Sequence, residues 1–231
     1  MRRFSMAVAL VLVVAGVAQA GFLSFESPSF TVGALDGQGG WTSTDGVVTD
    51  ADSSEGSQSI TPGPTGMTSM NLGKTSFSTE SYRVSADVRL GGSTLGYLAV
   101  SADSEFTTAG GKVIEWGWDG GFYAHGANQY TVEGSTPDSD RWVTLWGDFY
   151  SVGGDLRANL GWCELSQTPF VDGVRISNYD CADRDVNYLG ARTSSSAFVD
   201  NINAPVPEPS AIVLALSGLV GLVCYAWRKR K

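Results

Sequence analysis

The residues whose types and spacing come closest to catalytic chemistry lie in the segment Glu115-Trp116-Gly117-Trp118-Asp119. Two carboxylates four residues apart lie on one face of a β-strand, and glycoside hydrolysis requires a pair of carboxylates. In a regular strand their Cα atoms would be about 13 Å apart, whereas the two carboxyl groups of a retaining glycosidase are about 5 Å apart. We therefore predict that the protein is not an enzyme, with a glycan hydrolase or lyase as the least favoured alternative.

His125 is the only histidine of the chain and follows Tyr123 and Ala124. A single histidine excludes a metal site built from several histidines. No Gly-x-Ser-x-Gly sequence is present, so the nucleophile elbow of many serine hydrolases is missing. We expect this histidine in a loop or at the end of a strand, without a catalytic role.

Aromatic residues offer a second kind of chemistry, the stacking of rings on sugars. Six tryptophans lie between residues 21 and 204, at positions 41, 116, 118, 142, 146 and 162. Buried rings fill a core, whereas exposed rings can stack on a sugar. We expect most of these indoles in the core, and sugar stacking stays open for Trp116 and Trp118, with Tyr123 beside them.

Strand patterns separated by Gly, Asp, Asn and Ser recur from residue 21 to residue 204. The segment Tyr82 to Leu90 alternates apolar residues at even positions with polar residues at odd positions, and Arg141 to Tyr150 is a second long strand. Further strands are expected over residues 95–101, 112–118, 121–124, 129–132 and 156–165, and near 47, 60, 67–72, 174–176, 186–189 and 197–202. So many short strands in one domain predict an antiparallel sandwich or barrel.

Three segments carry a resemblance to a known fold: Phe25-Glu26, the glycine-rich run from Gly33 to Trp41, and Phe198 to Ile202. Together they resemble concanavalin A-like and laminin G-like jelly-roll domains and, more loosely, carbohydrate-binding modules. The resemblance implies an all-β fold, an antiparallel jelly-roll β-sandwich in which the first and last strands pair. That pairing would bring Glu26 and Asp200 together to hold a structural Ca²⁺, as in many carbohydrate-binding jelly rolls. No other cofactor is expected.

Cys163 and Cys181 are the only cysteines between residues 21 and 204. Two thiols in an exported domain are more often paired than not. We predict a disulfide between them.

The charge of the chain limits its partners. Of its 24 acidic and 15 basic residues, 23 and 9 lie in residues 21–204, which gives this part a net charge of −14. Binding to nucleic acid rests on cationic contacts to phosphate, so we predict that the protein does not bind it. The same charge disfavours acidic glycans.

The N-terminus has the composition of a secretory signal peptide. Arg2 and Arg3 precede an apolar run, which ends in Ala18-Gln19-Ala20. Small residues at the first and third of these positions fit signal peptidase. We predict cleavage between Ala20 and Gly21.

The C-terminus, residues 205–231, has three parts. Pro-Val-Pro-Glu-Pro-Ser precedes an uncharged apolar run, Ala211 to Trp227, and four cations close the chain. The prolines favour an extended tether. The 17 uncharged residues span about 25 Å as a helix, the short end of what crosses a bilayer. The basic end favours the cytoplasmic side. We predict one transmembrane helix here.

This end, with Pro207-Glu208-Pro209 at its head, resembles the PEP-CTERM sorting signal of Gram-negative bacteria. The resemblance implies an inner-membrane precursor that an exosortase cuts near these prolines and delivers to the cell surface or extracellular matrix. The predicted organisation is a signal peptide over 1–20, a β-sandwich over 21–204 and a sorting signal over 205–231. We predict a structural or adhesive role in contact with exopolysaccharide, which such signals accompany, with a carbohydrate-binding module as the alternative.

Overall fold

The computed structural model describes residues 21–64, 66–75, 81–91, 95–107, 111–126, 130–134, 136–138, 140–182, 184–193 and 196–204. The predicted signal peptide up to Ala20 and the predicted sorting segment 205–231, with Pro207, Glu208 and Pro209, lie outside these residues. Within the described ranges, no helix combines the length and the apolar character that crossing a membrane requires.

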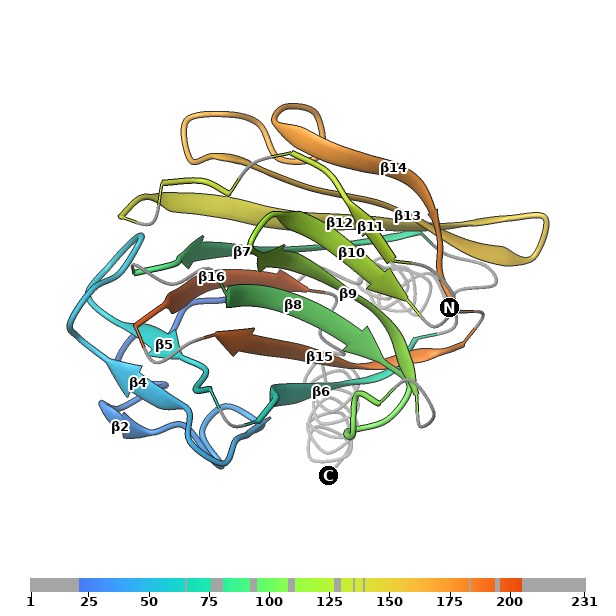
Figure 1. Ribbon diagram of the computed structural model, residues 1–231. Helices are drawn as coiled ribbons and strands as arrows, with labels where there is room; N and C mark the ends of the chain where they lie inside the picture. The colour runs from blue at the N-terminus through green and yellow to red at the C-terminus, as the bar shows by residue number, and fades with distance from the viewer. Residues whose placement is uncertain are drawn as a thin grey trace, which may run out of the picture. The chain divides into compact units, whose positions relative to one another are not determined.

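The described residues form two antiparallel sheets (Figure 1). The nine-stranded sheet has the order β14-β13-β12-β7-β16-β5-β4-β2, with β1 also paired to β16. Its strands are β1 (Gly21–Leu23), β2 (Gly33–Ala34), β4 (Val47–Thr49), β5 (Ser59–Thr61), β7 (Tyr82–Arg89), β12 (Trp142–Val152), β13 (Asp155–Glu164), β14 (Val174–Asp180) and β16 (Phe198–Ala204).

The seven-stranded sheet has the order β11-β10-β9-β8-β15-β6-β3. Its strands are β3 (Trp41–Thr42), β6 (Thr68–Thr75), β8 (Leu95–Ser101), β9 (Lys112–Asp119), β10 (Phe122–Gly126), β11 (Tyr130–Val132) and β15 (Val186–Thr193). The antiparallel β-sandwich predicted from the sequence is confirmed.

Alternation along the strands decides which side chains enter the core. In β7 the residues Tyr82, Val84, Ala86 and Val88 are buried, whereas Arg83 is exposed and Asp87 and Arg89 are half-buried. Successive side chains of a strand point to opposite faces, so the apolar set packs against the other sheet and the polar set faces outward. The two faces are those predicted from the sequence.

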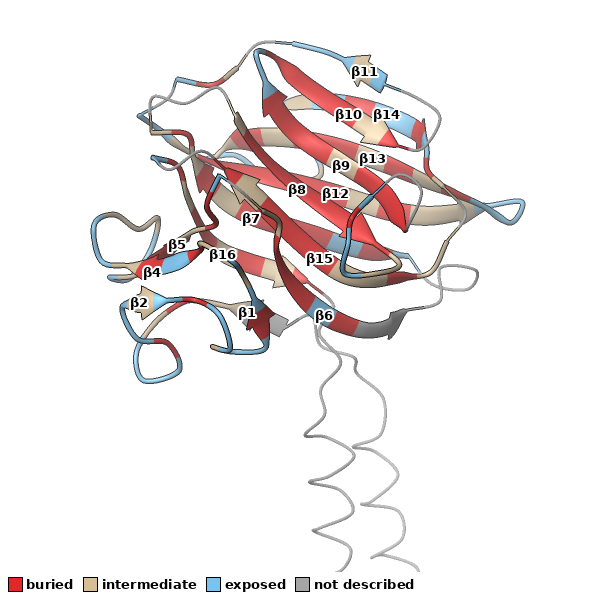
Figure 2. Cartoon of the chain, turned by 60° about the horizontal axis from the view of Figure 1, so that its bottom comes forward, coloured by how far each residue is buried: buried red, intermediate tan, exposed pale blue. Residues whose placement is uncertain are grey.

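The core lies between the two sheets and is rich in aromatic rings. The Trp116 ring of β9 lies 5.7 Å from that of Phe149 in β12, and the Trp118 ring of β9 lies 6.0 Å from that of Trp162 in β13. Figure 2 shows buried residues along β8, β9, β12 and β15, with exposed residues in the connecting loops and in β11. The two indoles of β9 are therefore core residues, in contact with the opposite sheet.

The first and last described strands pair, since β1 lies beside β16. β16 also pairs with β7 and β5, so it lies inside the sheet and not at its edge. A register shift between Asp200 and Asn203 marks a bulge in this strand, and Asn201 there has a φ of 47°. Asparagine tolerates this left-handed conformation better than most residues. The predicted pairing is confirmed, and the bulge changes how the end of β16 presents its side chains.

The predicted disulfide between Cys163 and Cys181 is wrong. Cys163 lies near the end of β13, whereas the N–H of Cys181 donates to the carbonyl of Leu156 near the start of that strand, at 3.1 Å. Leu156 and Cys163 are seven residues apart, about 23 Å along a strand, and a disulfide needs Cα atoms within about 7 Å. Both cysteines are buried thiols.

Candidate functional site

One row of residues crosses all seven strands of the seven-stranded sheet on the face turned away from the other sheet. The strand pairings link Thr42, Ser69, Gly190, Ala99, Glu115, His125 and Tyr130, one residue from each strand. Residues directly opposite one another in antiparallel strands point to the same side. Six spacings of about 4.8 Å give the row a length of about 29 Å. We call it the outer-face row.

The centre of the outer-face row is covered. A Cβ atom at Gly190 would lie 2.6 Å from Cγ of Met67 and 2.8 Å from Cε1 of Phe106, so these side chains pack directly on the glycine backbone. Phe106 is itself buried. A ligand could therefore reach the row at its two ends, at β3 and β6 on one side and at β9 to β11 on the other.

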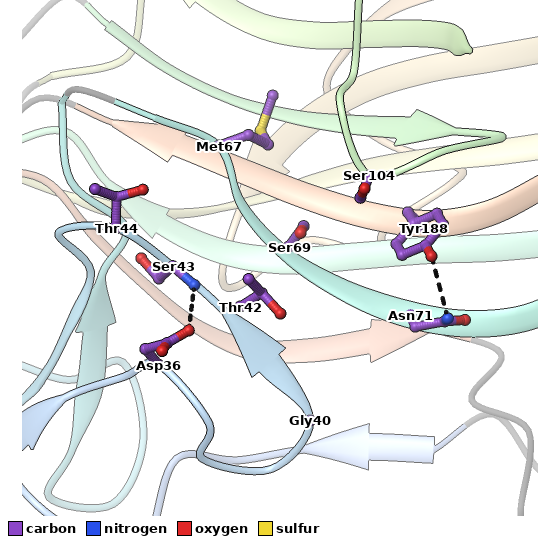
Figure 3. Close-up of a pocket in the computed structure, with 10 residues that line it drawn as sticks. All are labelled: Asp36, Gly40, Thr42, Ser43, Thr44, Met67, Ser69, Asn71, Ser104 and Tyr188. Carbon is purple, nitrogen blue, oxygen red and sulfur yellow. Dashed lines mark hydrogen bonds between the residues drawn. The ribbon is translucent and has the colours of Figure 1, made fainter. Parts of the chain in front are cut away.

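The first end opens into a polar hollow of about 700 Å³ (Figure 3). It is lined by Asp36, Gly40, Thr42, Ser43, Thr44, Met67, Ser69, Asn71, Ser104 and Tyr188. Asp36 is fixed by the N–H of Ser43 at 3.1 Å, and the amide of Asn71 lies 3.4 Å from the Tyr188 hydroxyl. Most of these groups are hydroxyls or amides, which both donate and accept hydrogen bonds. The hollow suits a ligand with many hydroxyl groups.

The second end holds a cluster of three ionisable side chains. Nζ of Lys112 lies 3.3 Å from Oε2 of Glu115, and Nδ1 of His125 lies 3.1 Å from Oε1 of the same carboxylate. Nζ of Lys112 also lies 3.4 Å from Nδ1 of His125, so the ammonium and the carboxylate both contact the same ring nitrogen. The His125 side chain is 39% exposed, whereas Lys112 is buried. Glu115 and Lys112 thus hold one ring nitrogen of a histidine whose side chain is partly exposed.

Tyrosine rings surround this cluster. The rings of Tyr97 and Tyr123 meet edge-to-face at 6.2 Å, and Tyr130 lies 5.7 Å from Tyr123 and 5.6 Å from His125. Burial, followed by the negative charge of Glu115, raises the pKa of Tyr123, so its hydroxyl stays protonated. Tyr130 is 56% exposed and presents its ring to solvent.

The structure corrects the predicted sugar-stacking residues. Trp116 and Trp118 have no exposed surface, and Tyr123 is 4% exposed. A ring needs an open face to stack on a sugar, so none of the three offers one. The exposed ring on this face is Tyr130, which could not be predicted from the sequence because β11 has only three residues and little alternation. Its position beside His125 comes from the pairing of β10 with β11.

The cluster lacks a catalytic carboxylate pair. Glu115 already contacts Lys112 and His125, and Asp119 lies four residues further along β9, about 13 Å away in a strand. Glycosidases use two carboxyl groups between about 5 and 9.5 Å apart. No group of three or more metal-binding side chains occurs among the described residues. The arrangement can bind through hydrogen bonds and one exposed ring.

Glu26 and Asp200 do not fit the predicted Ca²⁺ site. Oε1 of Glu26 accepts hydrogen bonds from the N–H groups of Ser57 and Gln58, at 2.7 and 2.8 Å. The carboxylate of Asp200 accepts from the N–H groups of Ser54 and Asn201, at 3.1 and 2.8 Å. Hydrogen-bond donors therefore face both carboxylates, where a cation would need oxygen ligands.

Comparison with known proteins identifies the end of the chain. Residues 205–231 match the PEP-CTERM protein-sorting motif, which confirms the sorting signal predicted from the sequence. This motif marks an exported protein that is held in the membrane until an exosortase processes it. No curated protein matches the sequence.

Two solved structures are similar to part of this chain. A galectin of Caenorhabditis elegans is 12% identical, with a TM-score of 0.36, over 61% of this chain and 91% of the galectin. A sialidase of Trypanosoma rangeli is 13% identical, with a TM-score of 0.45, over 85% of this chain. The match spans 32% of that sialidase.

Proposed function

We propose that the exported domain is a non-catalytic protein of the cell surface or extracellular matrix that adheres to exopolysaccharide. The observation that carries the proposal is the outer-face row, which has a polar hollow at one end and an exposed tyrosine beside a histidine at the other. A row of about 29 Å is long enough to contact several sugar units of one polymer. The sorting motif supports a location outside the cell.

The chemistry of the two ends favours a neutral glycan. Hydroxyl and amide groups line the hollow, and sugar hydroxyls both donate and accept hydrogen bonds with such groups. An exposed ring such as Tyr130 can stack on the apolar face of a sugar. The net charge of −14 over residues 21–204 repels polymers rich in uronic acids.

A carbohydrate-binding module with a defined groove is the second candidate, and the hollow favours it. A module would bind one short oligosaccharide in the hollow, whereas an adhesive surface would need a longer chain that reaches both ends of the row. Comparison of an oligosaccharide series with the intact polymer separates the two. The wide spacing of Glu115 and Asp119 along β9, about 13 Å in a regular strand, supports a non-catalytic role in either case.

A glycan array followed by titration calorimetry on the full-length protein tests the proposal. We expect binding to a neutral polysaccharide and weaker binding by Tyr188→Phe, which removes a hydroxyl from the hollow. Tyr150→Phe is the matched control, because Tyr150 lies on the other sheet and its hydroxyl donates to Asn178 at 3.3 Å. Release of reducing sugar from a bound glycan, or equal loss in both variants, would overturn the proposal.

A further inference from the structure

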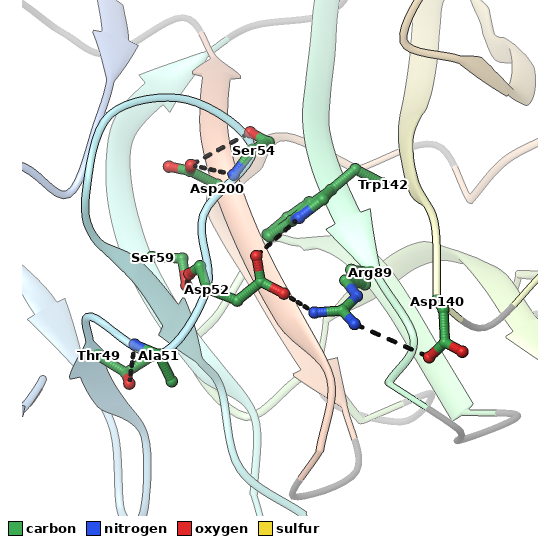
Figure 4. A network of polar contacts seen from close by, with 9 residues as sticks. All are labelled: Thr49, Ala51, Asp52, Ser54, Ser59, Arg89, Asp140, Trp142 and Asp200. Atoms are coloured by element: carbon green, nitrogen blue, oxygen red, sulfur yellow. Dashed lines mark hydrogen bonds and ion pairs between the residues drawn. The ribbon is translucent and has the colours of Figure 1, made fainter.

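A loop between β4 and β5 crosses the outer face of the nine-stranded sheet and is fastened there by polar contacts (Figure 4). Asp52 in this loop forms an ion pair with Arg89 of β7 and accepts a hydrogen bond from Nε1 of Trp142 at 3.2 Å. Two residues further on, Ser54 approaches Asp87 and Asp200. We call residues 50–58 the clasp loop.

Beneath the clasp loop, two carboxylates stand side by side on neighbouring strands. Asp87 of β7 is directly opposite Asp200 of β16, and Thr144 of β12 is opposite Asp87 on its other side. Directly opposite like charges destabilise a sheet. Asp200 is fully buried and Asp87 is half-buried, so water screens the repulsion poorly.

The Ser54 hydroxyl lies between the two carboxylates. Its Oγ is 2.9 Å from Oδ2 of Asp87 and 3.1 Å from Oδ2 of Asp200. These two distances place the carboxylate oxygens no more than about 6 Å apart, within the range in which one carboxylate raises the pKa of another.

Asp200 accepts hydrogen bonds from the N–H groups of Ser54, Glu55 and Asn201, at 3.1, 3.3 and 2.8 Å. The Ser54 hydroxyl nevertheless lacks a hydrogen for one of its two contacts when both carboxylates are ionised. A serine hydroxyl has one hydrogen to donate and two lone pairs to accept with. Nδ2 of Asn201 contacts both Oγ of Ser54 and Oδ2 of Asp87, at 2.9 Å each, and thereby uses both of its hydrogens. The Ser54 hydrogen can serve one aspartate fully, and the contact with the other then joins two oxygens without a hydrogen.

We propose that Asp87 and Asp200 share one proton through the Ser54 hydroxyl, and that this proton joins β7, β16 and the clasp loop. With Oδ2 of Asp200 protonated, that oxygen donates to Oγ of Ser54, and Ser54 donates to Oδ2 of Asp87. Asp87 then accepts from Ser54, Asn201 and Thr144, the last at 2.8 Å, and keeps the single negative charge. In this arrangement, each of these polar contacts is a hydrogen bond with its own donor hydrogen.

The other charged groups around the cluster do not replace this proton. The nearest cation on β7 is Arg89, which pairs with Asp52 of the clasp loop and with Asp140 at 3.8 Å. Glu55 and Glu26 add negative charge to the loop region, and β12 contributes the uncharged Thr144 and Trp142. Burial raises the pKa of Asp200, while the N–H groups of Asn201, Glu55 and Ser54 oppose that rise.

The consequence is a stability that depends on external pH. A carboxyl group whose pKa is higher in the folded state than in the unfolded chain stabilises the fold below its unfolded pKa. That contribution is lost as the pH rises through the folded pKa, because two adjoining strands then carry like charges. The seam under the clasp loop is therefore strongest in acid and weakens toward neutral and alkaline pH, which an exported protein meets directly.

Carboxyl titration by ¹³C NMR of the aspartate-labelled full-length protein tests the proposal. We expect one aspartate titration step above the ordinary range of aspartate, and we expect the carboxyl signals of both Asp87 and Asp200 to change in that step. Asp87→Asn removes this step, because its amide can accept from Ser54 and donate to Thr144 without a second charge. If every aspartate titrates at or below about pH 4, the proposal is overturned.

Unfolding measurements give a second readout on the same protein. The wild type loses stability as the pH rises from about 5 to 8, and Asp87→Asn loses much less. Asp148→Asn is the control, since Asp148 of the neighbouring strand β12 lies on the same face of the sheet but pairs with the exposed Arg83. Stabilisation of the wild type by millimolar Ca²⁺ that Asp87→Asn abolishes would mean that a cation, and not a proton, occupies the seam.

Discussion

Gly117 of β9 lies directly opposite Tyr97 of β8, and a Cβ atom on the glycine would lie 2.5 Å from Cα of the tyrosine. The same glycine pairs with Tyr123 on its other side. The missing side chain leaves the rings of Tyr97 and Tyr123 free to meet edge-to-face above it. The position midway between Glu115 and Asp119 is thus occupied by glycine, the one residue that fits between these two strand neighbours.

Gly117→Ala should lower the free energy of unfolding by about 1 to 3 kcal/mol, since the new methyl group overpacks a close strand contact. The midpoint of urea unfolding measures this change. Gly66→Ala is the control, because its Cβ would have nothing nearer than 3.6 Å, and it should change stability by less than about 0.5 kcal/mol. Equal effects of the two substitutions would contradict the packing role of Gly117.

Trp116→Ala should cost about 3 to 5 kcal/mol, because it removes a fully buried indole that packs on Phe149. Tyr150→Ala, at a half-buried position of the other sheet, should cost clearly less. Chemical denaturation of both variants provides the comparison. A Trp116→Ala protein as stable as the wild type would mean that the indole lies outside the core.

Glu26 gives stability a pH dependence opposite in sign to that of Asp200. Hydrogen bonds from the N–H groups of Ser57 and Gln58 lower the pKa of Glu26. Its contribution is present above the ordinary value of 4.5 and is lost as the pH falls through the lowered pKa. Glu26→Gln should therefore flatten the loss of stability in acid, measured by thermal unfolding between about pH 5 and 3. The exposed Glu133→Gln should leave the acid limb as steep as in the wild type.

Cys163 and Cys181, two of the three cysteines of the chain, should behave as protected thiols. Burial, and then the charge of Asp172, raises the pKa of Cys163 to about 11, so little of the reactive thiolate exists near neutral pH. Native protein should react slowly with a thiol reagent at about pH 8, and denatured protein should react at both cysteines without prior reduction. Peptide mass spectrometry locates the labels on Cys163 and Cys181 separately from any label on Cys224. A mass lower by two hydrogens in the unreduced protein would show that the two cysteines form a disulfide after all.

Much of the fold follows from local alternation in the sequence. The two faces of β7 can be read from that strand alone, because apolar and polar residues alternate along it. The pairing of β1 with β16 came from a resemblance to jelly rolls. These features depend on neighbours in the chain or on a known fold, and the structure agrees with them.

The candidate site depends on long-range register, which no single segment encodes. Thr42, Ser69 and Gly190 belong to one row only because β3, β6 and β15 pair in one register. The prediction of a disulfide was wrong for the same reason. Cys163 lies near one end of β13, whereas Cys181 contacts the other end of that strand. Asp200 and Glu26 do reach one loop, as their expected proximity implied, and there they bind its N–H groups.

Tyr130→Ala separates binding from folding at the exposed end of the outer-face row. Tyr130 is 56% exposed on the edge strand β11, so its removal should change the free energy of unfolding by less than about 0.5 kcal/mol. If its ring stacks on a sugar, the loss should weaken binding of the neutral polysaccharide about five- to twelvefold, which corresponds to roughly 1 to 1.5 kcal/mol. Calorimetry and urea unfolding on the same preparation measure the two quantities, and Val152→Ala, also 56% exposed but on the other sheet, should change neither. Unchanged affinity in Tyr130→Ala would remove this end of the row from the binding surface and leave the polar hollow as the place of contact.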